Sequence, residues 1–394
     1  MSSVQEKCVS FKDKRMVWNT SIDVQGVVDA LNNLPIVHQL DLEGNTLGVE
    51  AAEAIGEALK QHPELRSALW RDLFNCRTRT EVLMSLQHLA NSLMYGSIKL
   101  TVLDLSMNNL GTDCFNGLDA IIRSGACYTL QELRLENCSL MPHATVLLAR
   151  SLIQLYKNAE KENTPLKLRT ITLGNNCMET EGCTELSEAF KVLKTLEVID
   201  LKQNDIFLDG VSSLALALAE NLQLRVFNMN DNALCEGLED ICLVLPQLTM
   251  LREIDFGECL IGNKGAFQLS QALENHLTHL EFLDLGFNHI CVDGGLAVVK
   301  SLKNKENLRY VYLGGNCFGA RGCQRILCEM NKLPTSGALG PFDEDVSEDD
   351  EFYVDTSLNE EGATDVATPD GSNPDGSNPD GSNPDGSNPD GRNE

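Results

Sequence analysis

Apolar and polar residues follow one pattern that recurs about every 28 residues along much of this chain. In each copy two leucine-like residues flank one variable residue. Three positions after the second of them stands an asparagine or cysteine, and another apolar residue follows two positions later. Nine copies are clear: residues 40–47, 103–110, 133–140, 171–178, 199–206, 227–234, 254–261, 283–290 and 311–318. A fixed period of this length indicates a stacked repeat architecture.

Each copy predicts a short buried strand, and the stretch after it predicts an amphipathic helix, for example over residues 49–60, 210–221 and 265–274. We therefore predict an α/β fold, a leucine-rich-repeat solenoid. Its parallel strands should line the concave face and its helices the convex face. The repeated asparagine or cysteine should point inward and satisfy backbone groups of the tight turn.

Two places break the period. Residues 65–74 lack the asparagine, carry Trp70 and Phe74, and are followed by Arg77 and Arg79. We interpret this irregular repeat as a functional insertion, with simple degeneration of a repeat as the alternative. The interval from Cys138 to Asn176 is also long, and we expect a polar insertion near residues 157–165.

The pattern divides the chain into four parts. Residues 1–39 hold one imperfect unit, expected to form an N-terminal capping repeat around Phe11 and Trp18. Residues 40–335 form the repeat domain, and residues 336–368 an acidic segment. Residues 369–394 repeat Pro-Asp-Gly-Ser-Asn, and proline and glycine at that density predict disorder.

Charge narrows the choice of partner. The net charge is -27, and 17 acidic residues against one basic residue lie between Asp343 and Glu394. Nucleic acid is excluded as a partner because its phosphates would be repelled. The variable residue of each strand should face outward on the concave side. These residues are Asp41, Leu69, Asp104, Arg134, Thr172, Asp200, Asn228, Asp255, Asp284 and Tyr312. This acidic stripe favours a basic globular protein, and a merely solvated face is the alternative.

The sequence lacks the common catalytic, metal-binding and targeting motifs. It has no apolar stretch long enough to span a membrane and no secretory signal. Its 14 cysteines include no Cys-x-x-Cys pair, so we expect reduced thiols and no metal site. No phosphate-binding loop or hydrolase motif occurs. The residues alone therefore predict a binding module without a cofactor.

Three segments carry information beyond the repeat pattern. Residues 42–52, residues 70–74 with the following residues 77–81, and residues 126–138 resemble signature repeats of the Ran GTPase-activating proteins. The similarity covers roughly residues 10–335. It implies a regulator that stimulates GTP hydrolysis by the small GTPase Ran and has no catalytic chemistry of its own. The partner would be Ran in its GTP form, alone or with a Ran-binding protein. We expect a monomer in the cytoplasm, and association with the nucleus or nuclear envelope stays open.

The resemblance also implies the site. Arg77 matches the arginine essential in that family, and Asn137 matches the essential asparagine. The family is thought to work without an inserted arginine finger. Asn137 would position the catalytic glutamine of Ran, while Arg77 would orient its loop or anchor Ran. Further partner contacts are expected from Arg79, Asp104, Arg134, Glu136, Asn175, Asp200, Asp255 and Asp284.

Several turns depart from the family pattern. The family reads Phe-Thr-Gly before its arginine, and this chain has Asn75 and Cys76 there. Asn175 and Cys177 stand where the family has arginines, and Met107 replaces an aspartate. Because interface arginines are often hot spots, a non-catalytic or weakened Ran-binding scaffold remains an alternative. A nuclease-inhibitor-like binder, suited to an acidic concave face, is the second alternative.

Overall fold

The computed structural model describes residues 7–342, so the five-residue repeats and most of the acidic segment lie outside the described residues. An eleven-stranded parallel sheet runs through this part in chain order. Its strands are β1 (Cys8–Ser10), β3 (Gln39–Asp41), β5 (Ser67–Leu69), β6 (Val102–Asp104), β7 (Glu132–Arg134), β8 (Thr170–Thr172), β9 (Val198–Asp200), β10 (Val226–Asn228), β11 (Glu253–Asp255), β12 (Phe282–Asp284) and β13 (Tyr310–Tyr312). β2 (Val17–Trp18) and β4 (Thr46–Leu47) pair separately.

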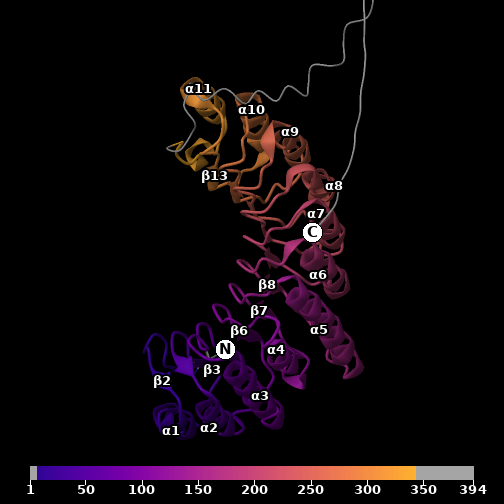
Figure 1. Cartoon of the computed structure of the whole chain (residues 1–394). Coiled ribbons are helices and arrows are strands. Elements are labelled where there is room, and N and C mark those ends of the chain that lie inside the picture. The colour runs from indigo at the N-terminus through magenta and orange to yellow at the C-terminus, as the bar shows by residue number, and fades with distance from the viewer. Residues whose placement is uncertain (1–6, 343–394) are drawn as a thin grey trace, which may run out of the picture. The chain divides into compact units, whose positions relative to one another are not determined.

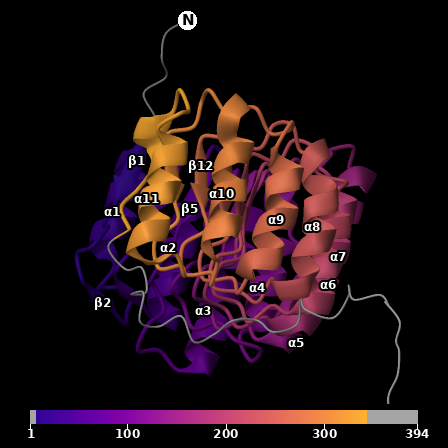
Figure 2. The same cartoon turned by 90° about the horizontal axis from the view of Figure 1, so that it is seen from above.

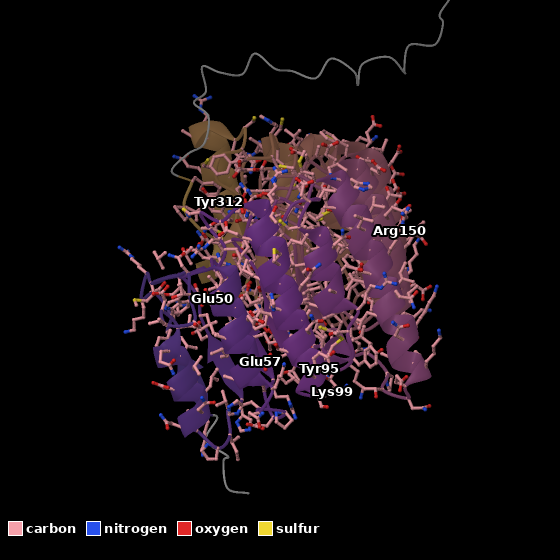
Figure 3. The ribbon with its side chains drawn as sticks, turned by 60° about the horizontal axis from the view of Figure 1, so that its bottom comes forward. Glu50, Glu57, Tyr95, Lys99, Arg150 and Tyr312 are labelled. Carbon is pink, nitrogen blue, oxygen red and sulfur yellow. The ribbon has the colours of Figure 1, made fainter. Side chains whose placement is uncertain are left out.

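Helices follow the strands and lie along the outer side of the repeat array, as Figure 1 shows and Figure 2 shows from above. They are α1 (Gln25–Asn33), α2 (Val49–Leu59), α3 (Arg79–Tyr95), α4 (Phe115–Ile122), α5 (Pro142–Lys161), α6 (Glu179–Leu193), α7 (Leu208–Leu218), α8 (Leu238–Val244), α9 (Gly262–Leu273), α10 (Val292–Ser301) and α11 (Gly319–Met330). Glu57 of α2 and Arg150 of α5 project from them into solvent (Figure 3). Within residues 7–342 the helices are too short or too polar to cross a bilayer.

The predicted fold class is confirmed, and the ten strands of the large sheet that follow β1 each end at the predicted outward position, in register with their neighbours. Two local expectations change. Residues 65–74 contain β5, which pairs with both β3 and β6, so this repeat is regular in its backbone. The extra residues after Cys138 mainly lengthen a helix, because α5 continues through residues 157–161 instead of forming a separate polar insertion.

Both ends of the sheet are covered. β1 pairs with β3, and Trp18 is buried with its ring 6.2 Å from that of Phe11. These are the two aromatic residues expected in the N-terminal capping repeat. At the other end Leu339 forms a parallel bridge to Val311 of β13, and Phe342 packs on Phe318. The described residues after the last helix therefore shield the final strand.

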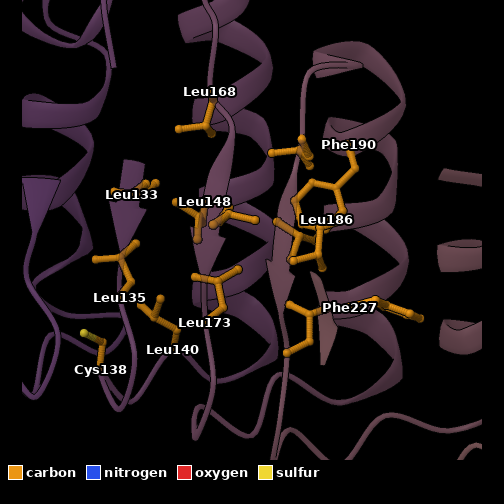
Figure 4. Close-up of a cluster of buried hydrophobic side chains, with 14 of the residues drawn as sticks. Leu133, Leu135, Cys138, Leu140, Leu148, Leu168, Leu173, Leu186, Phe190 and Phe227 are labelled. Atoms are coloured by element: carbon orange, nitrogen blue, oxygen red, sulfur yellow. The ribbon is translucent and has the colours of Figure 1, made fainter. Parts of the chain in front are cut away.

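The core is a continuous column of leucines, isoleucines and valines between sheet and helices, seen for the central repeats in Figure 4. Phe190 and Phe227 add large rings to it, and both are fully buried. Because no repeat can bury its apolar face alone, each one depends on its neighbours.

The repeated asparagines act as predicted. Asn108 is fully buried, and its Nδ2 donates to the backbone oxygens of Trp70 (2.9 Å) and Leu105 (2.7 Å). Its Oδ1 accepts from the backbone N–H groups of Leu73 and Phe74, both at 2.8 Å. Cys138 replaces part of this pattern with an Sγ–H bond to the oxygen of Leu105. Each such side chain thus ties one turn to the turn before it.

The turns also share one backbone conformation. In each repeat the residue before the asparagine position has a positive φ, and we call this set the left-handed row. Its members are Gly44, Asp72, Met107, Asn137, Asn175, Gln203, Asp231, Glu258, Phe287 and Gly315. From Gly44 through Phe287, each member's backbone N–H donates to a carbonyl of the next repeat. The conformation is therefore a requirement of the stacking.

We expect Asn108→Ala to lower the free energy of unfolding by about 3–5 kcal/mol, because several buried backbone groups would lose their partner. Urea denaturation followed by circular dichroism measures this change. Asn109, the next residue, is exposed, so Asn109→Ala is the matched control and should change stability by less than about 0.5 kcal/mol. Equal effects of the two substitutions would show that the ladder does not hold the turns.

Candidate functional site

The candidate site lies on the rim formed by the turns that follow the strands. Asn137 stands there three residues after β7, exposed, with φ +51°. Its backbone N–H donates to the oxygen of Gly174 at 2.8 Å, which fixes the turn. Its side-chain Nδ2 donates to Met107 Sδ at 3.2 Å, and thioether sulfur is a weak acceptor. Among residues 7–342 this amide has no other hydrogen bond, so it is available to a partner.

Arg77 points into the protein. Its guanidinium donates to Asn19 Oδ1 at 2.7 Å and to the backbone oxygens of Trp18 (3.1 Å) and Thr46 (3.2 Å). Only 9% of the side chain is exposed, and Glu81 lies 3.7 Å away as an ion pair. Arg77 therefore fastens its own loop to the turns of the first two repeats, which is the loop-orienting role of the two expected for it.

The loop that carries Arg77 is held at both ends. Phe74 is buried, and Thr78 caps α3 in a reciprocal capping box with Glu81. Between them Cys76 has φ +63°, a left-handed conformation that favours glycine. The backbone therefore keeps the conformation suited to the family's glycine although the residue has changed.

A charged network surrounds the turn that bears Asn137. Glu136 accepts from Arg71 at 3.3 Å and from Lys202 at 2.9 Å. The Nδ2 of Asn175 also lies 3.4 Å from its carboxylate. Burial alone would raise the pKa of Glu136, but the bonds and charges of Lys202 and Arg71 outweigh it and hold that pKa below its usual value. Glu136 is thus engaged within the chain.

Arg71 and Lys202 were missed by sequence reasoning. They occupy the same repeat position as Glu43 and Glu136, two residues after each strand ends. Aligning that one position across repeats would have revealed the alternating charges. Gly174 stands there between Glu136 and Lys202, and a Cβ on it would lie 2.8 Å from the Lys202 chain. The glycine therefore leaves room for Lys202 to reach across one repeat.

The two remaining predicted arginines also have partners within the chain. Arg79 begins α3, is 72% exposed and pairs with Asp113. Arg134 pairs with Asp104 at 3.8 Å and with Glu132. Both are surface pairs of small energetic value, so a docking protein could exchange them for its own contacts.

The predicted aspartates at the strand ends bind the backbone of the turns that follow them. Asp104, Asp200, Asp255 and Asp284 each accept a hydrogen bond from the backbone N–H two residues later. Asp104 is buried and the other three are half-buried, so none of these carboxylates is fully exposed to solvent. Burial raises the pKa of Asp200 and Asp255, and it raises that of Asp284 to about 6. Keeping Asp200, Asp255 and Asp284 ionised in the folded protein therefore costs free energy.

The structure thus brings together Asn137, Glu136 and Asn175. It places Arg77 and Arg79 two repeats before Asn137, and Asp255 and Asp284 several repeats after it. In residues 7–342 no three side chains of the metal-ligating kinds come together as an ion site.

Comparisons with known proteins agree with the repeat architecture. A family model described as leucine-rich repeat matches residues 96–113 and 276–299. The chain is 50% identical over 354 residues to the Ran GTPase-activating protein of Drosophila melanogaster, covering 89% of this chain and 59% of that protein. It is 36% identical over 338 residues to Ran GTPase-activating protein 1 of Xenopus laevis, covering 86% and 58%.

A ribonuclease inhibitor of Sus scrofa is 26% identical over 307 residues, covering 76% of this chain and 63% of that protein. The chain spans about three fifths of the length of the two Ran GTPase-activating relatives. The resemblance expected from residues 42–52, 70–81 and 126–138 is therefore confirmed by curated relatives over most of the chain.

We expect Cys76→Gly to raise the free energy of unfolding by up to about 1 kcal/mol. The substitution relieves the left-handed strain of a side chain, while the greater freedom of glycine in the unfolded chain offsets part of the gain. Urea denaturation measures it, with Cys8→Gly as a control at an exposed strand position where φ is not positive. Destabilisation by Cys76→Gly would show that the thiol contributes more than its backbone conformation costs.

Asp284→Asn should stabilise the protein at pH 7 by about 1–2 kcal/mol. The folded-state pKa of about 6 lies above the ordinary aspartate value of 3.8, so folding disfavours the charged form. The penalty is full above pH 6 and fades as the pH falls toward 3.8. Asparagine can still accept from Gly286. The gain in unfolding free energy from Asp284→Asn should therefore be smaller at pH 5 than at pH 7. The exposed Glu53→Gln should show no such pH dependence.

Proposed function

We propose that this chain, which is similar to the Ran GTPase-activating proteins, accelerates GTP hydrolysis by the small GTPase Ran. In this proposal the GTPase docks on the rim around Asn137 and keeps its own catalytic groups. The chain acts as a regulator: it positions the catalytic groups of the GTPase and supplies no reacting atom itself.

Relatives at 50% and 36% identity carry the activity in their names. The ribonuclease inhibitor, at 26% identity, supports the alternative of a nuclease-inhibitor-like binder less well. Because the chain matches about three fifths of each Ran relative, the activity is inferred for this chain from the matched repeats.

The observation that carries the proposal is the state of Asn137. Its amide is exposed on the rim, its backbone is fixed by Gly174, and its neighbour Glu136 is locked by two cations. An amide on a fixed backbone that, among residues 7–342, bonds only to a thioether can donate and accept toward a partner's side chain without first breaking a strong bond. Pre-organisation of this kind can contribute several kcal/mol to a barrier.

Arg77 supports a mechanism without an arginine finger. Four groups of its own chain surround the guanidinium, and extending it toward a nucleotide would leave the oxygens of Trp18 and Thr46 without that donor. Arg79, two residues further along the same segment, is 72% exposed. The proposed partner is Ran in its GTP form, alone or with a Ran-binding protein, with a monomer acting in the cytoplasm.

In single-turnover hydrolysis by Ran bound to GTP, we expect Asn137→Ala to slow the saturated rate by about 100-fold or more, because correct positioning supplies effects of that size. Binding to Ran loaded with a non-hydrolysable GTP analogue should weaken by less than about tenfold. Asn91→Ala, at an exposed asparagine of the convex helix α3, is the matched control and should leave the saturated rate within about threefold.

Arginine variants complete the test. Arg79→Ala should leave the saturated rate nearly unchanged, since a finger role would cost about 10³-fold or more. Binding of Ran without any acceleration by the parent chain would establish the non-catalytic scaffold instead. Absence of Ran binding would remove the proposal.

A further inference from the structure

A hollow of about 450 Å³ lies on the same rim, beyond Asn137 toward the C-terminal repeats. Three large apolar side chains line it: Phe207 is 54% exposed, Leu260 51% and Phe287 38%. The carboxylates Asp205, Asp231 and Glu258 lie among them, and no lysine or arginine lines the hollow. It spans the turns after β9, β10, β11, β12 and β13, so it is built from five successive repeats.

The fold does not require apolar residues at these positions. Phe287 belongs to the left-handed row, where the five preceding repeats have asparagine, glutamine or an acidic residue. Leu260 also has a positive φ, of 55°. A bulky side chain in that conformation costs folding energy, and exposure to water adds a further cost. Two such residues in one hollow point to a use outside the fold.

The ring of Phe287 is held in place. Gly315 in the next repeat has φ +71°, and a Cβ on it would lie 2.3 Å from that ring. The ring of Tyr312 also lies against that of Phe287, with a centroid distance of 6.4 Å. An aromatic side chain that is both partly exposed and pre-positioned is typical of an interface anchor, because little side-chain entropy is lost on binding.

Charge selects the occupant. The hollow carries three carboxylates, so the chain's own acidic segment after residue 342 would be repelled. A second copy of this chain is disfavoured for the same reason, because the net charge is -27. A basic segment with a large apolar side chain fits both the carboxylates and the apolar surface.

We propose that this hollow binds a basic segment with an apolar anchor on the surface of the GTPase that docks at Asn137. The inference rests on the proposed function and adds a second contact to it. The hollow supplies affinity and orientation, while the Asn137 turn supplies the rate effect. The two contacts lie on one rim, between the turns after β7 and β13, a span that one small globular domain can cover.

The test measures equilibrium binding and the saturated single-turnover rate with Ran and the full chain. Phe287→Ala should raise the Kd for Ran, loaded with a non-hydrolysable GTP analogue, by about 5–20-fold. At saturating chain concentration the hydrolysis rate should stay within about twofold of the parent. Leu216→Ala is the matched control, because Leu216 is 63% exposed on the convex helix α7, and it should change neither quantity.

A second pair of variants tests charge. Asp205→Asn combined with Glu258→Gln should slow association about 3–10-fold at low ionic strength, and the loss should shrink as salt is added. Glu160→Gln, at an exposed position of α5, should have no such effect. Urea denaturation of every variant excludes loss of folding as the cause.

The outcomes separate the two proposals. Unchanged Kd and association rate in both hollow variants, while Asn137→Ala still slows hydrolysis, would falsify this inference and leave the proposed function standing. A fall in the saturated rate of Phe287→Ala without a change in Kd would also overturn it. Failure of the parent chain to bind Ran would reject both.

Discussion

The buried side-chain ladder is the interaction on which the rest of this molecule depends. Asn108, Asn176 and their counterparts use one amide to serve backbone groups of two successive turns. Because a buried donor or acceptor without a partner costs about 1–3 kcal/mol, these amides, together with the thiol of Cys138, allow the turns to bend sharply. The sharp turns in turn fix the spacing of the strands and bring all the rim residues into line.

A consequence is that the rim separates backbone from side-chain requirements. Stacking imposes the left-handed conformation and its inter-repeat hydrogen bond on every member of the row, whatever the residue. The side chain at each position is then free to vary from Asn137 to Phe287. The positive φ of Asn137 is therefore no sign of strain stored for function. What distinguishes it is the environment: a thioether on one side and a locked Glu136 on the other.

The repeat period alone was enough to predict the strands, the inward asparagines, the outward positions and the convex helices, because each depends on the same local pattern. The family resemblance, and not the period, singled out Arg77 and Asn137. What the pattern could not predict depends on contacts between repeats. The burial of Arg77 requires Trp18 and Thr46, which lie 59 and 31 residues earlier in sequence. The link from Arg71 through Glu136 to Lys202 crosses several repeats and depends on Gly174 having no side chain. Residues 65–74 keep the backbone pairing of β5, because the missing asparagine changes side chains and leaves that strand intact; a functional role of this repeat stays a prediction.

Charge is arranged differently along the two halves of the concave face, and this difference gives the face a direction. At the position two residues after each strand ends, the first half carries Glu43, Arg71, Glu136 and Lys202, which neutralise one another. The second half has Gly257, Gly286 and Gly314 at that position, so no side chain there can pair with Asp255 or Asp284, and burial raises the pKa of both carboxyl groups. A rigid, neutralised half suits precise placement of one amide, since fixed ion pairs resist reorientation. A half with unneutralised carboxylates suits attraction of a basic surface, since a cation of the partner would offset the burial penalty on these carboxylates. Both properties follow from which residue stands at one repeat position, and the fold is the same in both halves.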